Sequence, residues 1–395
     1  MNKQIQDLYN ISQKEEKYII GLMSGTSVDG LDIALCKIKG HGGNTQVEIV
    51  HFETAEYKNN FKAEIKSVFS KKEIDLEKLC LLNPWVGLQH AALVLDALKK
   101  WNVSPKDVDI IASHGQTIYH APKSLHAQEK FGNATLQIGD GDHMAVATGI
   151  ITISDFRQKH IAAGGEGAPL AVYGDYFLFS QKDENRIMLN IGGIANFTFL
   201  DGSLDASKMF STDVGPGNTI MDAYVQAHFA GKYYDDKAVI ASQGTINEKL
   251  LTALQDHSFF TQGFPKTTGP ELFNLVYLKA AQIKTNSTTL SHEDTMATLN
   301  KFSATIIVDA IKRTLPNEIF TVYSSGGGMH NPLLMQHITN ALPNIIFKTT
   351  DDLNINPDAK EAVLFAVLAN ECLCGGETYF GESTPSVRMG KVSMP

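Results

Sequence analysis

The chain has 395 residues, of which 43% are hydrophobic and 19% are charged, a composition that suits a globular protein of two lobes. Its 34 Lys and Arg residues against 43 Asp and Glu give a net charge of −9, which argues against nucleic acid and anionic membranes as partners. The four cysteines form no CxxC pair, and the polar segment 1–17 lacks the apolar centre of a signal peptide, so we expect a cytoplasmic protein without zinc or disulfides.

The first part of the chain is predicted to fold as strands followed by helices. Residues 18–23 form an apolar run that ends in a turn rich in glycine, serine and threonine, 24–30. Residues 31–36 then alternate between apolar and polar, which is typical of a strand, so the two runs and the turn make a hairpin. The other elements predicted here are a strand at 47–52 and helices at 61–69 and 76–100.

Three further apolar runs each lead into a polar segment. Ligands in open α/β sheets gather at the carboxyl ends of strands, so we expect these segments to contact a substrate. A glycine-rich stretch, 162–169, precedes a predicted helix at 170–179 and is interpreted as a hinge. The three runs lie at 108–112, 136–138 and 150–153, and their polar segments at 113–117, 139–142 and 154–157.

The second half of the chain repeats the plan of the first. A strand at 187–190, a glycine turn at 191–196 and a returning strand at 197–200 correspond to the first hairpin. Few residues are identical between the halves, so the sequence indicates a duplicated architecture and not a short repeat. Two later strands, 209–211 and 320–323, deliver the glycine-rich segments 212–218 and 324–332, each before a helix.

Glycine loops at strand ends are suited to hold a triphosphate. Backbone N–H groups bind phosphate oxygens, and glycine lets the backbone approach closely. No GxxxxGK[ST] segment occurs, so ATP bound without a P-loop is the hypothesis. A tight turn alone explains any single loop, but five loops alternating with strands favour a common role. The cofactor-binding glycines predicted in the second half are Gly192, Gly193, Gly215, Gly217, Gly326, Gly327 and Gly328.

Two aspartates lie within the turns expected to hold phosphate. Phosphate would repel the carboxylates of Asp29 and Asp213 unless Mg²⁺ lay between them, so both are candidate metal ligands. The alternative is that each carboxylate only caps a turn or a helix. ATP and Mg²⁺ are therefore the predicted cofactors.

Several segments, spread over nearly the whole chain, resemble the anhydro-N-acetylmuramic acid kinase family. They are GLMSGTSVDGLD (21–32), SHGQT (113–117), DFR (155–157), AAGGEGAPL (162–170), NIGGIAN (190–196), DVGPGN (213–218), SGGGMHNP (325–332) and PDAKEA (357–362). The resemblance implies an α/β, two-lobed actin/hexokinase-like fold, that is, a duplicated ribonuclease H-like fold with an interlobe cleft, and a homodimer. It also implies a segment that binds the ATP phosphates, formed by Gly25, Thr26, Ser27, Val28, Asp29, Gly30, Leu31 and Asp32.

The same resemblance implies a reaction that serves the recycling of bacterial cell wall. In this family a base activates water to attack C1 of the anhydro-sugar, and the bridging oxygen leaves C1. That oxygen, O6, then accepts the γ-phosphoryl group of ATP, so leaving group and nucleophile are one atom. The expected product is N-acetylmuramate 6-phosphate.

The chain departs from the family pattern at the expected base. The family reads DFRxxD, with the second aspartate as base, whereas this chain has His160 at that position. Imidazole titrates near neutral pH, so His160 could keep the catalytic role. Asp155 or Glu166 could take it instead, or the activity could be altered or lost. A structural histidine, bonded to a neighbouring carbonyl, is the alternative interpretation of His160.

Other polar residues are candidates for the sugar site. Arg157 is predicted to bind a substrate carboxylate, although a structural pairing of Asp155 with Arg157 is equally compatible with the sequence. His114 and Gln116 are expected to reach sugar hydroxyls, with a buried polar network as the alternative. Glu166 is a further substrate-binding candidate.

The predicted lobes are 18–167, which carries the first phosphate loop and the sugar contacts, and 168–395, which carries the second phosphate loop and a glycine loop on the adenosine side. A predicted helix at 358–374 is expected to pack near the cleft. Two rival hypotheses remain: a kinase for another anhydro- or amino sugar, and a nucleotide-binding regulatory protein that has lost its base.

Overall fold

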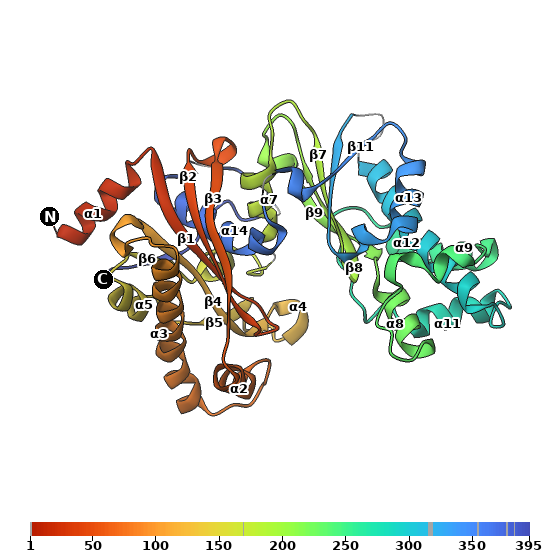
Figure 1. Ribbon diagram of the computed structural model, residues 1–395, viewed down its shortest axis with the longest axis horizontal. Helices are drawn as coiled ribbons and strands as arrows, with labels where there is room; N and C mark the ends of the chain where they lie inside the picture. Colours follow the sequence, from red (N-terminus) through yellow and green to blue (C-terminus); the bar gives the residue numbers. More distant parts are fainter. Residues whose placement is uncertain (1, 169, 315–318, 354, 377, 383) are drawn as a thin grey trace. The chain divides into compact units, whose positions relative to one another are not determined.

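The protein is described by a computed structural model that covers residues 2–168, 170–314, 319–353, 355–376, 378–382 and 384–395 (Figure 1). The chain divides into two compact units. Unit 1 comprises Met1–Ser180, Asp205–Lys208 and Ile355–Pro395, and unit 2 comprises Gln181–Leu204 and Met209–Asn354. This division differs from the predicted boundary after residue 167, because the C-terminal segment returns to unit 1.

Unit 1 is built on a mixed sheet of seven strands. The strands are β1 (Glu16–Ser24), β2 (Gly30–Lys39), β3 (Gln46–Glu56), β4 (Ile110–Ala121), β5 (Ala134–Ile138), β6 (Thr152–Ser154) and β12 (Lys391–Ser393). Their order is β12-β6-β4-β1-β2-β3, and β5 also pairs with β4. The strands β1, β2 and β3 form an antiparallel meander, whereas β4 runs parallel to both β1 and β6. The predicted hairpin and third strand are confirmed.

The helices of unit 1 include α2 (Asn59–Val68) and α3 (Leu76–Lys100) on one face of this sheet and α14 (Lys360–Cys374) on the other. The remaining helices are α1 (Lys3–Ser12), α4 (Lys123–His126), α5 (Gly141–Thr148), α6 (Phe156–Ala162) and α7 (Ala171–Phe179). Successive side chains of a strand point to opposite faces, so Ile20 and Leu22 of β1 join the core with α2 and α3. The intervening Gly21 faces α14, where a Cβ atom would lie 1.8 Å from the carbonyl oxygen of Ala362.

The buried face of α14 explains why the C-terminal segment belongs to unit 1. The helix contacts β1, β2 and β4, and its buried side chains include Val363, Phe365 and Val367. After it, β12 pairs with β6 in the same sheet. Burial of apolar side chains and strand pairing therefore place the C-terminal segment in the same unit as the N-terminal strands.

Unit 2 has a mixed sheet of five strands in the order β11-β10-β7-β8-β9. The strands are β7 (Arg186–Ile191), β8 (Ile194–Leu200), β9 (Phe210–Pro216), β10 (Thr321–Ser325) and β11 (Ile346–Thr349). The first three again form an antiparallel meander, and β10 runs parallel to β7. In each unit the first strand of an antiparallel meander also pairs with a parallel strand, which confirms the predicted duplication and the ribonuclease H-like architecture.

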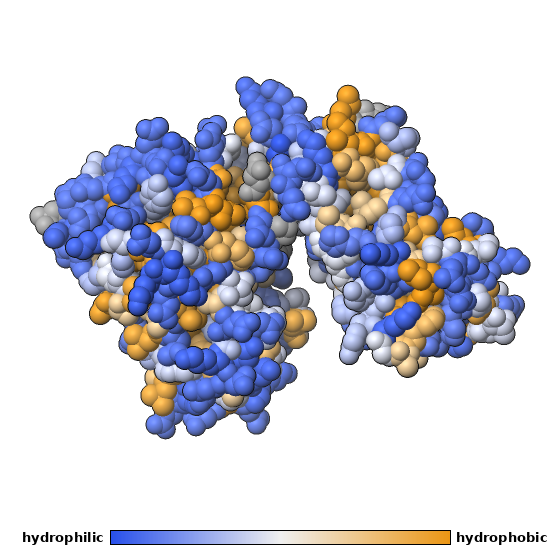
Figure 2. Space-filling model, viewed as in Figure 1, coloured by the Kyte–Doolittle hydropathy of each residue, from blue (hydrophilic) through white to orange (hydrophobic). Residues whose placement is uncertain are grey.

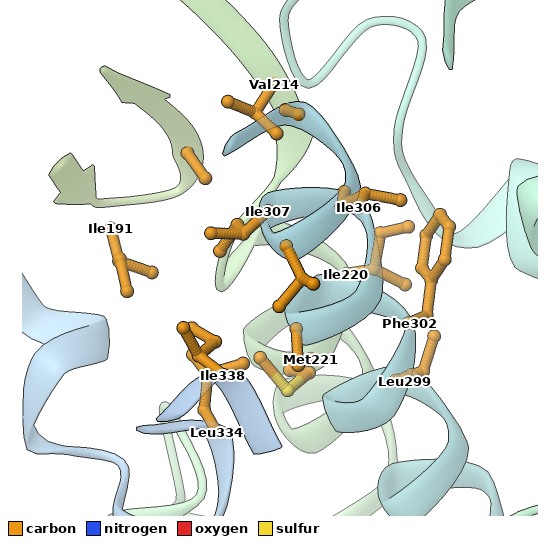
Figure 3. Close-up of a cluster of buried hydrophobic side chains, with 14 of the residues drawn as sticks. Ile191, Val214, Ile220, Met221, Leu299, Phe302, Ile306, Ile307, Leu334 and Ile338 are labelled. Carbon is orange, nitrogen blue, oxygen red and sulfur yellow. The ribbon is translucent and has the colours of Figure 1, made fainter. Parts of the chain in front are cut away.

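The core of unit 2 lies between its sheet and its helices. The helices are α8 (Thr219–His228), α9 (Glu248–Gln255), α10 (Ser258–Thr261), α11 (Leu275–Lys284), α12 (His292–Thr314) and α13 (Pro332–Ala341). Figure 3 shows Ile306 and Ile307 of α12 among side chains from β9, α8 and α13, such as Val214, Ile220 and Ile338. This packing fixes the strand that carries the second predicted phosphate loop.

Two predicted loops lie inside strands. Residues 113–117 were expected to follow a strand, but β4 continues to Ala121 because it pairs with β5 as well as with β1. Gly115, at φ +75°, lies where the register between β1 and β4 shifts. Likewise Asp213–Pro216, expected after a strand, belong to β9.

The surface of each unit is largely polar on the face shown in Figure 2, with small apolar areas between polar ones. No helix within the described ranges is both long enough and apolar enough to cross a membrane.

Candidate functional site

The turn between β1 and β2 in unit 1 contains the first predicted phosphate loop. The N–H of Val28 donates to the carbonyl oxygen of Gly25 (3.2 Å), and the N–H of Tyr57 donates to that of Asp29 (3.0 Å). Val28 has φ +58° and is buried, so packing of its side chain maintains a left-handed conformation that a β-branched residue disfavours. The turn is therefore held by its own backbone bonds and by the buried side chain of Val28.

A chain of buried polar groups supports this turn. Ser24 Oγ donates to Gln116 Oε1 (2.5 Å), and Gln116 Nε2 donates to the carbonyl oxygen of Gly25 (3.3 Å). Tyr57 Oη donates to Ser24 Oγ (2.8 Å) and also lies 2.9 Å from His90 Nε2. Gln116 is fully buried, and this network is the alternative that the sequence left open for it. Gln116 therefore supports the turn between β1 and β2, and its expected contact with a sugar hydroxyl stays a prediction.

His114 and Arg157 form a second buried contact in unit 1. Arg157 Nε donates to His114 Nε2 (2.9 Å), and Arg157 Nη1 donates to the carbonyl oxygen of Gly167 (2.7 Å). His114 Nδ1 lies 2.9 Å from the carbonyl oxygen of Gly115 and is the donor there, because Nε2 accepts. Burial and the charge of Arg157 lower the pKa of His114 to about 3, so the ring is neutral. His114 therefore orients Arg157.

His160, the predicted base, is buried beside the glycine-rich stretch. Its Nδ1 accepts a hydrogen bond from the N–H of Gly167 (2.9 Å), which leaves the proton of a neutral imidazole on Nε2. Burial, with a contribution from Arg157, lowers the pKa of His160. A Cβ atom at Gly165 would lie 2.2 Å from the His160 ring, so the loop packs closely on the histidine. Neither ring nitrogen has a free lone pair for a water proton in this arrangement.

The two alternative bases have different surroundings. Asp155 has φ +56° and its carboxylate forms an ion pair with Lys391 of β12, so the considered pairing of Asp155 with Arg157 is not formed. Glu166 is exposed at the surface of the glycine-rich stretch. The segment expected to act as a hinge, 162–169, includes residue 169, which lies outside the described residues.

A cavity of about 260 Å³ adjoins Arg157 in unit 1. It is lined by residues of β1, α6, α7 and α14, including Met23, Arg157, Gly174, Lys360, Glu361 and Phe365. Lys360 Nζ forms an ion pair with Asp175 Oδ1 (2.8 Å), whereas Glu361 is open to solvent. The cavity thus combines a guanidinium, an accessible carboxylate and apolar walls, which suits a polar ligand of modest size.

Glu361 lines this cavity and was not among the residues predicted from the sequence. The surrounding protein raises its pKa by desolvation, and the nearby charge of Asp32 raises it further, while Arg157 and Lys360 oppose the rise. Its segment, PDAKEA, was recognised as a motif but no role was given to it. The signal that could have identified it is a pair of charged residues, Lys360 and Glu361, directly before the apolar run of the helix.

The three acidic candidates for phosphate or metal binding are held differently. Asp29 is 80% exposed, and its carboxylate lies 4.0 Å from Lys62 Nζ. Asp32 accepts a hydrogen bond from Thr54 Oγ1 (2.6 Å), and desolvation raises its pKa. In unit 2, Asp213 Oδ2 accepts from the N–H of Thr268 (2.9 Å), and desolvation raises its pKa as well. Within the described part of the chain, no three His, Cys, Asp or Glu residues form a metal cluster.

The glycine loops of unit 2 come together around one strand end. The N–H groups of Gly217 and Asn218 donate to the carbonyl oxygens of Gly193 and Gly192 (both 2.9 Å). A Cβ atom at Gly217 would lie 2.4 Å from the Gly192 oxygen. The loop 326–328 packs on Ile191, because a Cβ atom at Gly328 would lie 2.3 Å from its side chain. The structure therefore places Gly192, Gly193, Gly217, Gly326, Gly327 and Gly328 in one backbone cradle.

Gly215, the remaining predicted glycine, lies behind this cradle. It has φ +145°, and a Cβ atom there would lie 2.6 Å from the side chain of Ile306. It is buried and packs on the core helix α12, so its role is to let β9 approach that helix.

Comparison with known proteins decides the family. A model of the family described as anhydro-N-acetylmuramic acid kinase matches residues 17–384. The chain belongs to the anhydro-N-acetylmuramic acid kinase family. It is 59% identical to the anhydro-N-acetylmuramic acid kinase of Pseudoalteromonas atlantica, with 100% of both chains covered. It is 57% identical to that of Pseudoalteromonas translucida, over 100% of this chain and 99% of the relative.

A more distant member of the anhydro-N-acetylmuramic acid kinase family still matches nearly end to end. The protein of that name from Caldanaerobacter subterraneus is 38% identical over 98% of this chain and 99% of its own. The resemblance inferred from the sequence motifs is confirmed, and so is the two-unit α/β fold expected with it. The matched range includes both glycine-loop regions and the segment that carries Glu361.

Proposed function

We propose that this protein is an ATP-dependent kinase that opens the 1,6-anhydro bond of anhydro-N-acetylmuramic acid and phosphorylates the freed O6. The product is N-acetylmuramate 6-phosphate, and the role is in cell-wall recycling. Family membership over the length of the chain supports the reaction class. The observation that carries the assignment of the site is the cavity in unit 1, where Arg157 and Glu361 lie beside the end of β1.

Arg157 is our candidate for the residue that binds the substrate carboxylate. His114 and the Gly167 carbonyl fix two of its N–H groups, and the others remain for a ligand. A guanidinium held in this way binds a carboxylate with less loss of side-chain freedom than a mobile one.

Glu361 is our candidate for the base that takes a proton from the attacking water. Its carboxylate is accessible, and its raised pKa makes it a better proton acceptor than an ordinary glutamate. The structure supports this role better than that of His160, whose Nδ1 accepts from Gly167, or of Asp155, whose Oδ2 is paired with Lys391. We therefore propose His160 as a positioning residue that holds the loop around Gly167.

The segments proposed to bind ATP through their backbone amides are 25–32 in unit 1 and the glycine loops of unit 2. In unit 2 the N–H groups of Gly217 and Asn218 are used within the cradle, so contacts to phosphate fall to the neighbouring loops 192–193 and 326–328. Cations in kinase sites commonly use one or two carboxylates together with the phosphates, so the lack of a three-residue cluster among the described residues fits Mg²⁺ held with ATP. Asp29 and Asp213 are the proposed protein ligands, and Mg²⁺ would neutralise charge on the transferring phosphate.

Location and assembly are proposals as well. The four cysteines, Cys36, Cys80, Cys372 and Cys374, are free thiols, which favours the reducing, ATP-containing cytoplasm. A homodimer is proposed from the family resemblance. Light scattering on the purified protein would show a mass of about 86 kDa for a dimer of 43.2 kDa chains.

The decisive experiment follows phosphosugar and ADP together, with ATP, Mg²⁺ and 1,6-anhydro-N-acetylmuramic acid as reactants. Equal amounts of both products support the proposal. ADP without phosphosugar indicates another sugar or a slow ATPase, and absence of both indicates a binding protein.

The variant Glu361→Gln tests the base. It keeps the shape of the side chain but cannot accept a proton, so kcat is expected to fall by about 1,000-fold, within the range for loss of a general base. Because ionisation of Glu361 is opposed by its surroundings, the neutral variant should not melt at a lower temperature than the parent protein. A kcat within about threefold of the parent value would reject Glu361 as the base.

The pH profile gives a second measure of the same group. A base must be ionised, so kcat/KM is expected to fall as pH drops through the raised pKa of Glu361, and this acid limb should disappear in Glu361→Gln.

A further inference from the structure

A cavity of about 620 Å³ in unit 2 is separate from the one in unit 1 and adjoins β9, the strand that carries Asp213. Its apolar wall includes Val214 of β9, Phe260 of α10 and Ile306 of α12. Its charged groups are Lys266, Lys312, Arg313 and Asp309, so three cations face one carboxylate. None of these residues was assigned a role from the sequence or in the proposed reaction.

Lys266 is the buried charge of this cavity. Its residue is 9% exposed, and Nζ donates one hydrogen bond, to the carbonyl oxygen of Phe259 (2.7 Å). The ammonium also lies 4.2 Å from the centre of the Phe259 ring. None of the ion pairs found among the described residues includes Lys266, and burial together with Arg313 lowers its pKa to about 8. A buried ammonium with two unused N–H groups is stabilised by an anion.

The other cations frame the opening. Arg313 donates to the carbonyl oxygens of Phe260 and Gln262 (2.5 and 2.7 Å), which holds its guanidinium in place. Lys312 is exposed beside it, and both cations lower the pKa of Asp309 against the larger effect of desolvation. The cavity therefore combines cationic side chains with apolar lining residues.

Lys266, which lines the cavity, is hydrogen-bonded to the strand that carries the second predicted phosphate loop. The backbone of Lys266 bonds to β9 in both directions: its carbonyl oxygen accepts from the N–H of Asp213 (2.9 Å), and its N–H donates to Thr212 Oγ1 (3.0 Å). The side chains of Phe260 and Ile306, which line the cavity, also lie against Gly215. A ligand that moves Lys266 or Phe260 therefore acts on the strand that holds Asp213.

We propose that this cavity is a regulatory site for a small organic anion, with a phosphate or carboxylate group bound by Lys266 and Arg313 and an apolar body against Phe260 and Ile306. Concave sites with apolar walls and a few placed charges are the usual form of small-molecule sites. The regulatory part rests on the proposed role of Asp213 in the kinase reaction, whereas the binding part does not.

Binding is tested by calorimetry on the full chain with phenyl phosphate and phenylacetate as probes and inorganic phosphate as a comparison. Saturable binding of one aromatic anion, at least about threefold tighter than inorganic phosphate, is expected because only the aromatic anion can also contact the apolar wall. Absence of saturable binding of both aromatic anions, or equal affinity for inorganic phosphate, overturns the proposal. A preference for phenyl phosphate or for phenylacetate identifies the anionic group.

Variants locate the binding. Lys266→Met should weaken the aromatic anion by about thirtyfold, since it removes a buried charge. Lys312→Glu alters only an exposed residue and should weaken it about fivefold without affecting folding. Lys279→Glu, an equal charge change at an exposed site on α11 outside the cavity, is the matched control. Equal affinities of Lys312→Glu and Lys279→Glu would overturn the location.

Coupling is tested separately, by measuring ATP affinity with and without saturating aromatic anion. A change of about threefold or more in the parent protein, which in Lys312→Glu requires about fivefold more anion, supports regulation. No change rejects regulation even if binding is confirmed. Failure of ATP to bind at all would contradict the proposed kinase function and leave the binding result intact.

Discussion

The two glycine turns of this protein occupy equivalent places in two similar sheets but are held by different means. In unit 1 the turn after β1 depends on buried side chains, which run from Gln116 through Ser24 to Tyr57. In unit 2 the turn after β7 depends on backbone bonds between the loops 192–193 and 217–218. The two sheets thus share a strand arrangement but stabilise their turns by different hydrogen bonds. We therefore expect substitutions to affect the two turns differently.

The largest effect is expected from Gly217→Ala in unit 2. The added Cβ atom would lie 2.4 Å from the Gly192 oxygen, so the backbone cradle must move. We expect ATP affinity to fall by about thirtyfold, because amides that bind phosphate must keep their positions. Gly263→Ala is the control, since this exposed glycine of unit 2 lies outside the cradle and an added Cβ atom there would meet nothing within 4 Å. Calorimetry with ATP compares them, and equal affinities would refute the backbone explanation.

In unit 1 the glycine-rich loop depends on a side chain, His160. His160→Ala removes the acceptor for the Gly167 N–H and should reduce kcat/KM by about tenfold, as Arg157 loses part of its support. His160→Asn offers an amide oxygen in place of Nδ1 and should restore most of the activity. If His160 is instead the base, both variants lose turnover equally and Asn gives no rescue. Steady-state kinetics of the pair decides between the roles.

A smaller effect is expected from Tyr57→Phe. The change removes the hydroxyl that donates to Ser24 and leaves Ser24 and His90 without that partner in a buried site. The free energy of unfolding should fall by about 1–2 kcal/mol. Chemical denaturation measures it, and an unchanged midpoint would show that the network contributes little to the first turn.

The smallest effect is expected from Lys391→Ala. The ion pair of Lys391 with Asp155 is at the surface, with Lys391 65% exposed, so its loss should cost less than about 0.5 kcal/mol. Turnover should be unchanged if Asp155 has no catalytic role. A marked change in kcat would return Asp155 to the list of candidate bases.

The sequence was sufficient to predict the repeated strand, turn and strand in each unit, because alternation of apolar residues and glycine turns are local signals. It was not sufficient for the partners of polar side chains. Gln116 was expected to bind a sugar hydroxyl, and its hydrogen bond to Ser24 follows only from the pairing of β4 with β1. The use of His160 Nδ1 as an acceptor likewise depends on the position of Gly167. Glu361 was missed because its importance depends on the cavity formed with Arg157, which no local pattern shows.

The return of the last forty or so residues to unit 1 has a consequence for synthesis. Until α14 and β12 leave the ribosome, β1 and β4 lack the helix that covers one face, and β6 lacks its neighbour at the sheet edge. Unit 2 lies entirely within residues 181–354, so its complete sequence is translated earlier. Unit 1, which is translated first, is thus the last to be completed. Until α14 is available, the nascent chain would expose the apolar face of the sheet that this helix covers.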